Sequence, residues 1–235
     1  MDWFEWHKGY RRSPALNARL SLVRLQIANC LDVCPTGEIR VVSVCAGDGR
    51  DLLGVLIDHP RTQDVKARLV ELDRRLVECG RAAAQEAGLS EQIEFVNGDA
   101  TMSSAYEGIA PVDLVIVCGV FGHVREAETP RLVQTLSCLC KSGGFVVWTR
   151  RLNDSESTRH AAAIQTLLRE SAFEEVCFEV TPQGKSGVST HRYLGEALAL
   201  PNNQQLFEFS DFSGPRDSEI PDTVGQLTKG LTPPP

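Results

Sequence analysis

The chain has 235 residues, a formal net charge of −7, 42% apolar residues and eight cysteines. This length fits one α/β domain with appendages, and an acidic chain without a basic block argues against a nucleic-acid partner. The sequence has no apolar run long enough to span a bilayer, its first residues do not resemble a signal peptide, and its cysteines lack the spacing of zinc ligands. We therefore expect a cytoplasmic protein with reduced thiols, without a metal and without a membrane segment.

The N-terminal part of the chain has a helical pattern. Apolar residues recur every three or four positions from Leu16 to Leu31, which predicts one or two amphipathic helices between Trp3 and Leu31. Trp3, Trp6, His7 and Tyr10 add an aromatic segment before it. We treat residues 1–36 as a helical unit that precedes the main domain.

Strands and helices alternate in the rest of the sequence. The predicted strands are residues 39–44, 67–71, 93–96, 112–118, 145–149, 176–181 and 190–198, with helices at 50–57, 73–87, 128–140 and 156–171. This order is typical of a doubly wound, mostly parallel sheet with helices on both faces, and the last two strands suggest an antiparallel pair. A break at Gly143–Gly144 separates the helix at 128–140 from the strand at 145–149. We place the main domain at residues 37–200 and an irregular C-terminal tail at 201–235.

A tight turn of small residues follows the first strand. It reads Cys45-Ala46-Gly47-Asp48-Gly49 and leads directly into a helix. A strand that turns sharply into a helix presents backbone N–H groups and the positive helix end to a ligand, and glycine lets the backbone approach closely. The turn predicts a nucleotide-binding loop.

Two acidic positions follow the next two strands. Glu71 ends the second strand, where a carboxylate can accept both hydroxyls of a ribose; a solvated strand-end charge is the alternative. Asp73 could instead cap the following helix. Gly98-Asp99-Ala100 follows the third strand, where Asp99 can accept from an adenine amine and Ala100 can donate its N–H to the ring; a simple β-turn is the alternative. Together these positions indicate an adenosine.

The fourth strand opens into the loop Cys118-Gly-Val-Phe-Gly-His123. With these four elements, residues 39–198 resemble the class I S-adenosylmethionine (SAM)-dependent methyltransferases, and the CAGDGRDL turn resembles that of a bacterial subgroup with a Trp-x-x-Trp-His N-terminus. The resemblance implies a Rossmann-like sheet of seven strands with the last one antiparallel, SAM as cofactor and S-adenosylhomocysteine (SAH) as product. Cofactor contacts would then come from Cys45, Ala46, Gly47, Asp48, Gly49, Glu71, Leu72, Gly98, Asp99, Ala100, Cys118 and Gly119.

Two positions depart from the family pattern. Ser43 stands where the first strand usually carries an acid, and Cys45 replaces the first glycine of the turn. Asp48 could supply the missing negative charge to the ammonium group of SAM. Cys45 needs an ordinary negative φ, or else the loop differs slightly from the family's turn.

The resemblance also implies roles on the acceptor side. The loop after the fourth strand faces the methyl group in this family, so His123 is the candidate general base, with a structural imidazole as the alternative. Similar enzymes lay their N-terminal segment over the cofactor as a lid, which suggests Trp6, His7 and Tyr10, although these residues could simply pack against the domain. Arg150 follows the fifth strand, and we expect His191 to begin the antiparallel strand near the same edge.

Three functions remain after this reading. The first is methyl transfer from SAM to a small molecule, because the fourth-strand loop lacks the Asn/Asp-Pro-Pro-aromatic and Pro-Cys patterns of nucleic-acid methyltransferases. The second is an NAD-dependent oxidoreductase, which is disfavoured because Leu52 stands where a dinucleotide fingerprint has its third glycine. The third is a SAM-binding protein without catalysis, which the variant Ser43 and Cys45 leave open. The sequence does not predict an oligomeric state.

Overall fold

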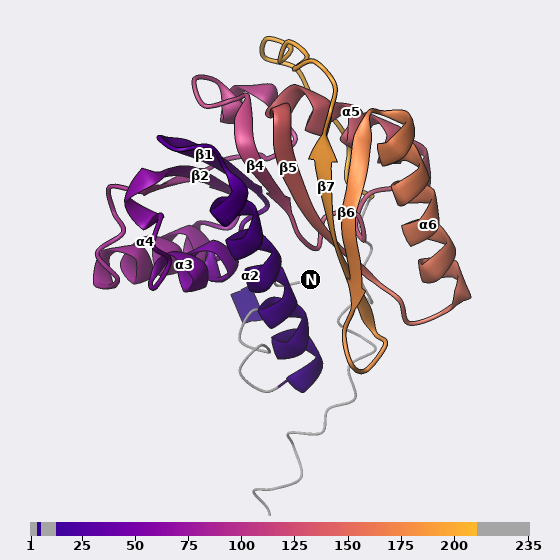
Figure 1. Cartoon of the computed structure of the whole chain (residues 1–235), viewed down its shortest axis with the longest axis horizontal. Helices are drawn as coiled ribbons and strands as arrows, with labels where there is room; N and C mark the ends of the chain where they lie inside the picture. The colour runs from indigo at the N-terminus through magenta and orange to yellow at the C-terminus, as the bar shows by residue number, and fades with distance from the viewer. Residues whose placement is uncertain (1–3, 6–12, 211–235) are drawn as a thin grey trace, which may run out of the picture.

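The computed structural model describes residues 4–5 and 13–210 of the chain. Its centre is a seven-stranded sheet in the order β3-β2-β1-β4-β5-β7-β6 (Figure 1). Strand β7 runs antiparallel to both of its neighbours, whereas the other adjacent pairs are parallel. The predicted sheet is thereby confirmed. The strands are β1 (Ile39–Val44), β2 (Val65–Glu71), β3 (Ile93–Asn97), β4 (Val112–Val117), β5 (Cys140–Arg151), β6 (Phe173–Val180) and β7 (Ser186–Tyr193).

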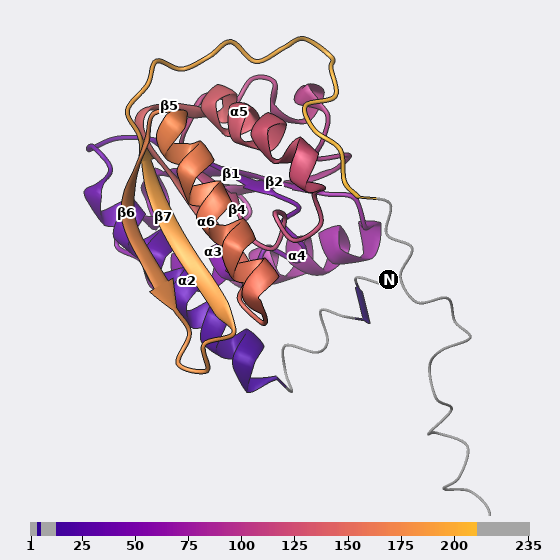
Figure 2. The ribbon, with the colours of Figure 1, turned by 90° about the vertical axis from the view of Figure 1, so that its right-hand side faces the viewer.

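Helices cover both faces of the sheet (Figures 1 and 2). One face carries α2 (Pro14–Val33), α3 (Arg50–Leu56) and α4 (Arg74–Glu86), and the other carries α5 (Thr129–Leu139) and α6 (Ser155–Glu170). Neighbouring residues of one strand point to opposite faces of the sheet. Val41 lies in the apolar cluster beneath α2 and α3, and Val42 lies in the apolar cluster beneath α5 and α6. Burial on both faces explains the continuous apolar runs of the central parallel strands.

Helix α2 is a layer of this core. Its residues Val23, Ile27 and Leu31 are buried, and the helix packs against α3, β5 and β7. The Ser13 side chain caps its first turn by accepting a hydrogen bond from the backbone N–H of Leu16. Helix α2 is therefore part of the core that covers one face of the sheet.

Strands β5 and β7 begin well before the predicted residues 145 and 190. Gly143 and Gly144 lie inside β5 and do not break it, at an irregularity in the pairing with β4 where Gly143 has a φ of 80°. Strand β7 begins at residue 186 because the hairpin turn before it is short: the N–H of Thr181 donates to the carbonyl of Ser186 at 2.9 Å.

The segment after β7 returns across the domain. Residues 201–210 contain no helix and no named strand, as predicted, but they are not a free tail, because Leu206 and Phe207 are buried. Figure 2 shows this yellow segment passing over α5 before it descends beside the magenta part of the chain. The rest of the predicted tail lies outside the described residues. Within the described part, no helix combines the length and apolar character needed to cross a membrane.

Candidate active site

The carboxyl ends of the central parallel strands bring the predicted site residues to one edge of the sheet. Val44 lies opposite Val70 on the neighbouring strand, and Glu71 lies opposite Asn97. The glycine turn, the end of β2 and the loop after β3 are therefore adjacent, and the loop after β4 opens at the same edge. Open α/β sheets bind their ligands at this edge.

The turn after β1 has a left-handed backbone at three positions. Gly47 and Gly49 have φ values of 59° and 69°, and a Cβ atom on Gly49 would lie 2.5 Å from the side chain of Leu69. Glycine is required there by conformation and by space. Cys45 also has a positive φ, 54°, so the expectation of an ordinary negative φ is wrong. The chain keeps the turn that a glycine would adopt, and it does so at the cost of local backbone strain.

Glu71 joins this turn to the end of β2. One carboxylate oxygen accepts the N–H of Gly47 at 2.8 Å, and the other accepts the N–H of Asp73 at 2.8 Å. A carboxylate has about four acceptor positions, so each oxygen can accept a further hydrogen bond. Leu72 follows directly, with 71% of its surface exposed. Asp73 caps α4 by accepting the N–H of Arg75, which agrees with the capping interpretation.

The loop after β3 is held close to the same carboxylate. The N–H of Gly98 donates to the carbonyl of Glu71 at 3.0 Å, and the Asp99 side chain accepts the N–H of Thr101 at 2.8 Å. The Asp99 contact is the local turn that the sequence offered as an alternative. The buried Tyr106 hydroxyl donates to the carbonyl of Ala100 at 2.6 Å and supports the loop from below. Sequence reasoning missed Tyr106.

The carboxylates of this cluster affect the pKa values of Cys45 and Tyr106. Burial raises the pKa of the Cys45 thiol, and the negative charges of Glu71 and Asp99 raise it further. Burial likewise raises the pKa of Tyr106, with added contributions from Cys45 and Asp99. The thiol and the phenol both stay protonated at neutral pH, so the negative charge of this cluster resides on the two carboxylates.

Two further aspartates lie at the start of α3 and differ in their surroundings. Asp48 accepts a hydrogen bond from Nε of Arg50 at 2.7 Å and forms an ion pair with the same guanidinium, which neutralises its charge locally. Desolvation raises the pKa of Asp51, although the N–H of Leu52 donates to it at 2.9 Å and the positive charge of Arg19 opposes the rise. Asp51 is a candidate site residue that sequence reasoning missed; its position in the first turn after the glycines could have revealed it.

The loop after β4 is fixed at its start. The N–H of Gly119 donates to the Thr149 hydroxyl at 2.8 Å, and the N–H of His123 donates to the carbonyl of Val120 at 2.8 Å. Burial lowers the pKa of His123 below 6.5, and the positive charges of Arg151 and Arg150 lower it further. The imidazole is therefore neutral at pH 7, which is the form that accepts a proton.

Comparison with known proteins agrees with this geometry. A family model described as "Putative methyltransferase" matches residues 19–154, more than half of the chain. The chain belongs to this methyltransferase family. It is also 27% identical over 113 residues to the Escherichia coli protein YnbC, in a match that covers 47% of this chain but only 19% of YnbC.

Solved structures share the fold of this chain. One is the 1,6-didemethyltoxoflavin-N1-methyltransferase of Burkholderia thailandensis, solved with 1,6-didemethyltoxoflavin and S-adenosylhomocysteine; it has a TM-score of 0.59 and 17% identity, and the match covers 82% of this chain and 84% of that one. Another is the [4+2]-cyclase SpnF, with a TM-score of 0.60 and 16% identity, over 78% and 85% of the two chains. At these identities the likeness shows the fold alone.

Arg150 supports the loop after β4. Its Nη1 donates to the carbonyl of Phe121 at 3.2 Å, and its Nη2 lies 3.2 Å from Nδ1 of His160. His160 in turn lies 3.1 Å from the Glu126 carboxylate. The guanidinium of Arg150 therefore contacts both the loop after β4 and His160.

His191 lies away from this edge, so the prediction that it begins the antiparallel strand is wrong. It is the sixth residue of β7 and pairs with Val146, near the middle of β5. The short hairpin turn starts β7 earlier, which carries His191 along the strand into the interior. Its side chain is fully buried, and Nδ1 accepts from the Trp148 indole at 3.2 Å. Trp6, His7 and Tyr10, the predicted lid residues, lie outside the described part of the chain.

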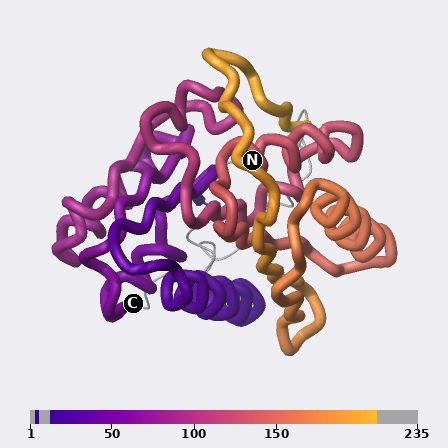
Figure 3. Tube along the Cα trace, turned by 45° about the horizontal axis from the view of Figure 1, so that its top comes forward, coloured from indigo at the N-terminus to yellow at the C-terminus, as the bar shows by residue number. Residues whose placement is uncertain are grey.

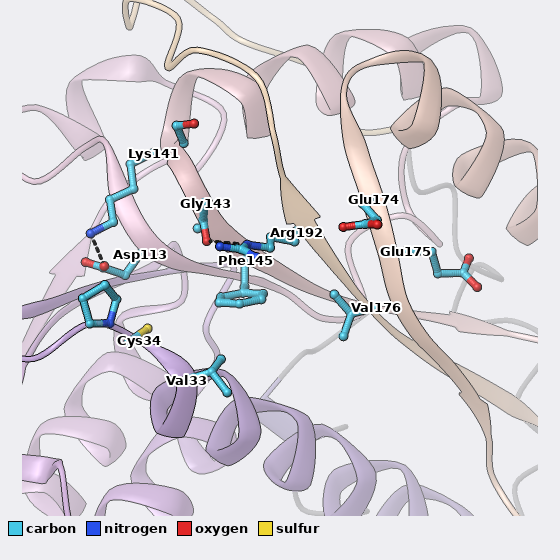
Figure 4. A pocket seen from close by; sticks show the side chains of 13 residues that line it. Val33, Cys34, Asp113, Lys141, Gly143, Phe145, Glu174, Glu175, Val176 and Arg192 are labelled. Atoms are coloured by element: carbon cyan, nitrogen blue, oxygen red, sulfur yellow. Dashed lines mark hydrogen bonds and ion pairs between the residues drawn. The ribbon is translucent and has the colours of Figure 1, made fainter.

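A cavity of about 590 Å³ opens at the opposite edge of the sheet (Figure 4). Lys141 forms an ion pair with Asp113 there, and the guanidinium of Arg192 lies over the Phe145 ring at 5.9 Å. These residues lie near the start of β4 and β5 and the end of β7, so the cavity is separate from the candidate active site. Within residues 4–5 and 13–210, no group of three or more His, Cys, Asp or Glu side chains could hold a metal ion.

Proposed function

We propose that this methyltransferase uses S-adenosylmethionine and methylates a small molecule at the carboxyl edge of its sheet. The observation that carries the proposal is the position of Glu71. Its carboxylate is fixed by the N–H groups of Gly47 and Asp73, yet retains acceptor positions at the ligand-binding edge.

The residues around Glu71 suit the adenosine half of this cofactor. The two carboxylate oxygens can accept the ribose hydroxyls, and the exposed side chain of Leu72 offers an apolar surface to the face of a base. Asp99 and the N–H of Ala100 lie on the adjacent loop, where they can pair with the edge of the adenine ring.

Asp51 suits the methionine half better than Asp48 does. The carboxylate of Asp48 is already neutralised by Arg50, whereas the raised pKa of Asp51 reflects loss of water around its charge. A ligand ammonium would stabilise that charge. Asp51 therefore takes the role left open by Ser43, with Gly119 and Cys118 at the adjoining end of β4.

The chemistry requires little covalent help from the protein. Bound SAM supplies an activated methyl group on a sulfonium, so the protein mainly has to align the acceptor. The neutral imidazole of His123 accepts the proton that a hydroxyl or an ammonium acceptor loses. We expect the rate of transfer to fall as the pH drops through the pKa of His123, below 6.5.

Composition and one structural neighbour support a small-molecule methyl acceptor and a cytoplasmic location. The net charge of −7 disfavours nucleic acid, and the toxoflavin methyltransferase with the same fold carries a small-molecule substrate in its structure. All eight cysteines are free thiols, which supports a cytoplasmic location.

A SAM-binding protein that does not methylate is the second candidate. The [4+2]-cyclase SpnF has the same fold, and Cys45 strains the turn that would hold the cofactor. The NAD-dependent oxidoreductase is disfavoured further, because Leu52 is fully buried in the core where a dinucleotide fingerprint needs a glycine.

Calorimetry followed by label transfer tests the proposal. We expect the full chain to bind SAH and not NAD⁺, and to transfer a labelled methyl group from SAM to a component of a small-molecule extract but not to RNA. Replacement H123Q should abolish most of the transfer while leaving SAH binding unchanged. Tight NAD⁺ binding without SAH binding would overturn the proposal, and SAH binding without transfer to any fraction would favour the second candidate.

A further inference from the structure

The segment that follows β7 returns to the active-site edge and links two of its loops. We call residues 204–210 the strap. In Figures 2 and 3 the yellow chain leaves the end of β7, passes the α5 side of the domain and reaches the magenta segments. Nothing in the proposed function assigns a role to the strap.

The first end of the strap pairs with the loop that carries Asp99. The N–H of Leu206 donates to the carbonyl of Thr101 at 2.8 Å, and the N–H of Ser103 donates to the carbonyl of Gln204 at 2.9 Å. The Ser103 hydroxyl accepts the N–H of Gln204 at 2.9 Å. These contacts form a short antiparallel bridge two residues beyond the proposed adenine contact.

The second end of the strap pairs with the loop that carries His123. Both the backbone N–H and the hydroxyl of Ser210 donate to the carbonyl of His123, at 2.8 and 2.7 Å. Phe209 forms an antiparallel bridge with Val124, the next residue of the loop. Two hydrogen bonds on one carbonyl oxygen use both of its lone pairs and fix the orientation of that peptide unit.

The middle of the strap is anchored in the core. Phe207 is fully buried among the residues beneath α5, and its ring contacts that of Phe209 with centroids 5.3 Å apart. Arg131 of α5 donates to the carbonyl of Gln205 at 3.0 Å, and the N–H of Glu208 donates to the Glu128 carboxylate at 3.2 Å. The strap is thus fixed to the core between the two loops that it contacts.

We propose that the strap positions His123 against the adenosine site and that Ser210 is the positioning residue for the methyl-transfer step. This role rests on the proposed function. The loop between Gly119 and His123 contains no regular secondary structure, and small errors in the placement of a reacting group cost large factors in rate. Arg150 holds the loop at the Phe121 carbonyl and the strap holds it at the His123 carbonyl, so the backbone that carries the imidazole is held at two points.

Three variants of the full chain separate positioning from general stability. S210A removes the hydroxyl and keeps the backbone hydrogen bond, and S210T restores a hydroxyl. T166A is the matched control, because the Thr166 hydroxyl donates to the carbonyl of Ala162 at 3.1 Å on the exposed surface of α6. The readouts are the NMR titration of the His123 imidazole, assigned with H123Q, the exchange rate of the His123 amide, and calorimetry with SAH.

We expect S210A to raise the pKa of His123 toward 6.5, because a looser loop admits water around the imidazole. The His123 amide should exchange about fivefold faster, the effect of losing one hydrogen bond. Transfer of labelled methyl groups to the small-molecule extract should slow while SAH affinity stays unchanged, and S210T and T166A should behave like the wild type.

An unchanged titration and exchange rate in S210A would overturn the positioning role, and so would equal changes in S210A and T166A. Failure of the wild-type chain to bind SAH would instead overturn the proposed function. The two failures are distinguishable, because the titration needs no cofactor and the wild-type calorimetry needs no variant.

Discussion

Replacing Glu71 tests how the glycine turn and the ribose site depend on one carboxylate. E71Q keeps the size of the side chain and removes its charge. The two carboxylate oxygens accept the N–H groups of Gly47 and Asp73, both at 2.8 Å. A glutamine oxygen can accept only one of these donors, and its NH₂ group faces the other.

The size of the effect follows from these contacts. A hydrogen bond to a charged group contributes about 1.5–3 kcal/mol, so E71Q should lower the free energy of unfolding by about 2 kcal/mol. Loss of the charged acceptor for a ribose hydroxyl should cost a similar amount in binding, which weakens SAH about 10- to 100-fold. E71A removes both acceptors and should weaken binding further.

Denaturant unfolding and calorimetry with SAH measure the two effects separately. E78Q is the control: Glu78 forms an exposed i,i+4 pair with Arg74, and such a pair contributes about 0.5 kcal/mol or less. The reasoning fails if E71Q unfolds and binds SAH like the wild type, or if E78Q weakens SAH binding to the same extent.

Replacements at three other positions probe the interior and the loops. Burial lowers the pKa of His191 from 6.5 to about 4, so on acidification the unfolded chain binds a proton at this residue at a higher pH than the folded chain does. The free energy of unfolding should therefore fall by about 3 kcal/mol as the pH drops from 6.5 to 4. In H191N this dependence of the free energy of unfolding on pH should be weaker. C45V should lower the melting temperature, because a β-branched side chain is strained at a φ of 54°. C45G should retain the stability and the SAH affinity of the wild type. Equal stability of C45V and C45G would contradict this reasoning. R150K cannot reach both the Phe121 carbonyl and His160, so label transfer should slow with unchanged SAH affinity, and a normal rate would show that the loop does not need this support.

The sequence predicted the sheet, and the edge at which the candidate site residues meet, because both depend on local signals. Apolar runs such as Val112–Val117 mark strands buried on both faces, and the spacing from Gly47 to Glu71 reflects one βαβ unit. Carboxyl ends of parallel strands meet at one edge, so the chain order alone assembled these residues correctly.

The error at His191 arose because a local turn decides where the strand begins. The position of His191 depended on a hairpin turn closed by Thr181 and Ser186, which composition did not reveal.

The strap was hidden for a related reason. Its contacts with the two loops are mostly backbone hydrogen bonds, which leave no pattern in side chains. Its two buried residues, Leu206 and Phe207, lie in a segment rich in Pro, Asn and Gln that is typical of an irregular tail. Tertiary packing of so few apolar residues has no periodicity from which it could be predicted.

A crystal structure of the full chain with SAH tests the central claim most directly. The account predicts that the ribose hydroxyls lie within hydrogen-bonding distance of Glu71, that the amino group lies near Asp51, and that the sulfur faces the loop that carries His123. A ribose bound away from Glu71, or a sulfur that faces away from His123, would contradict it.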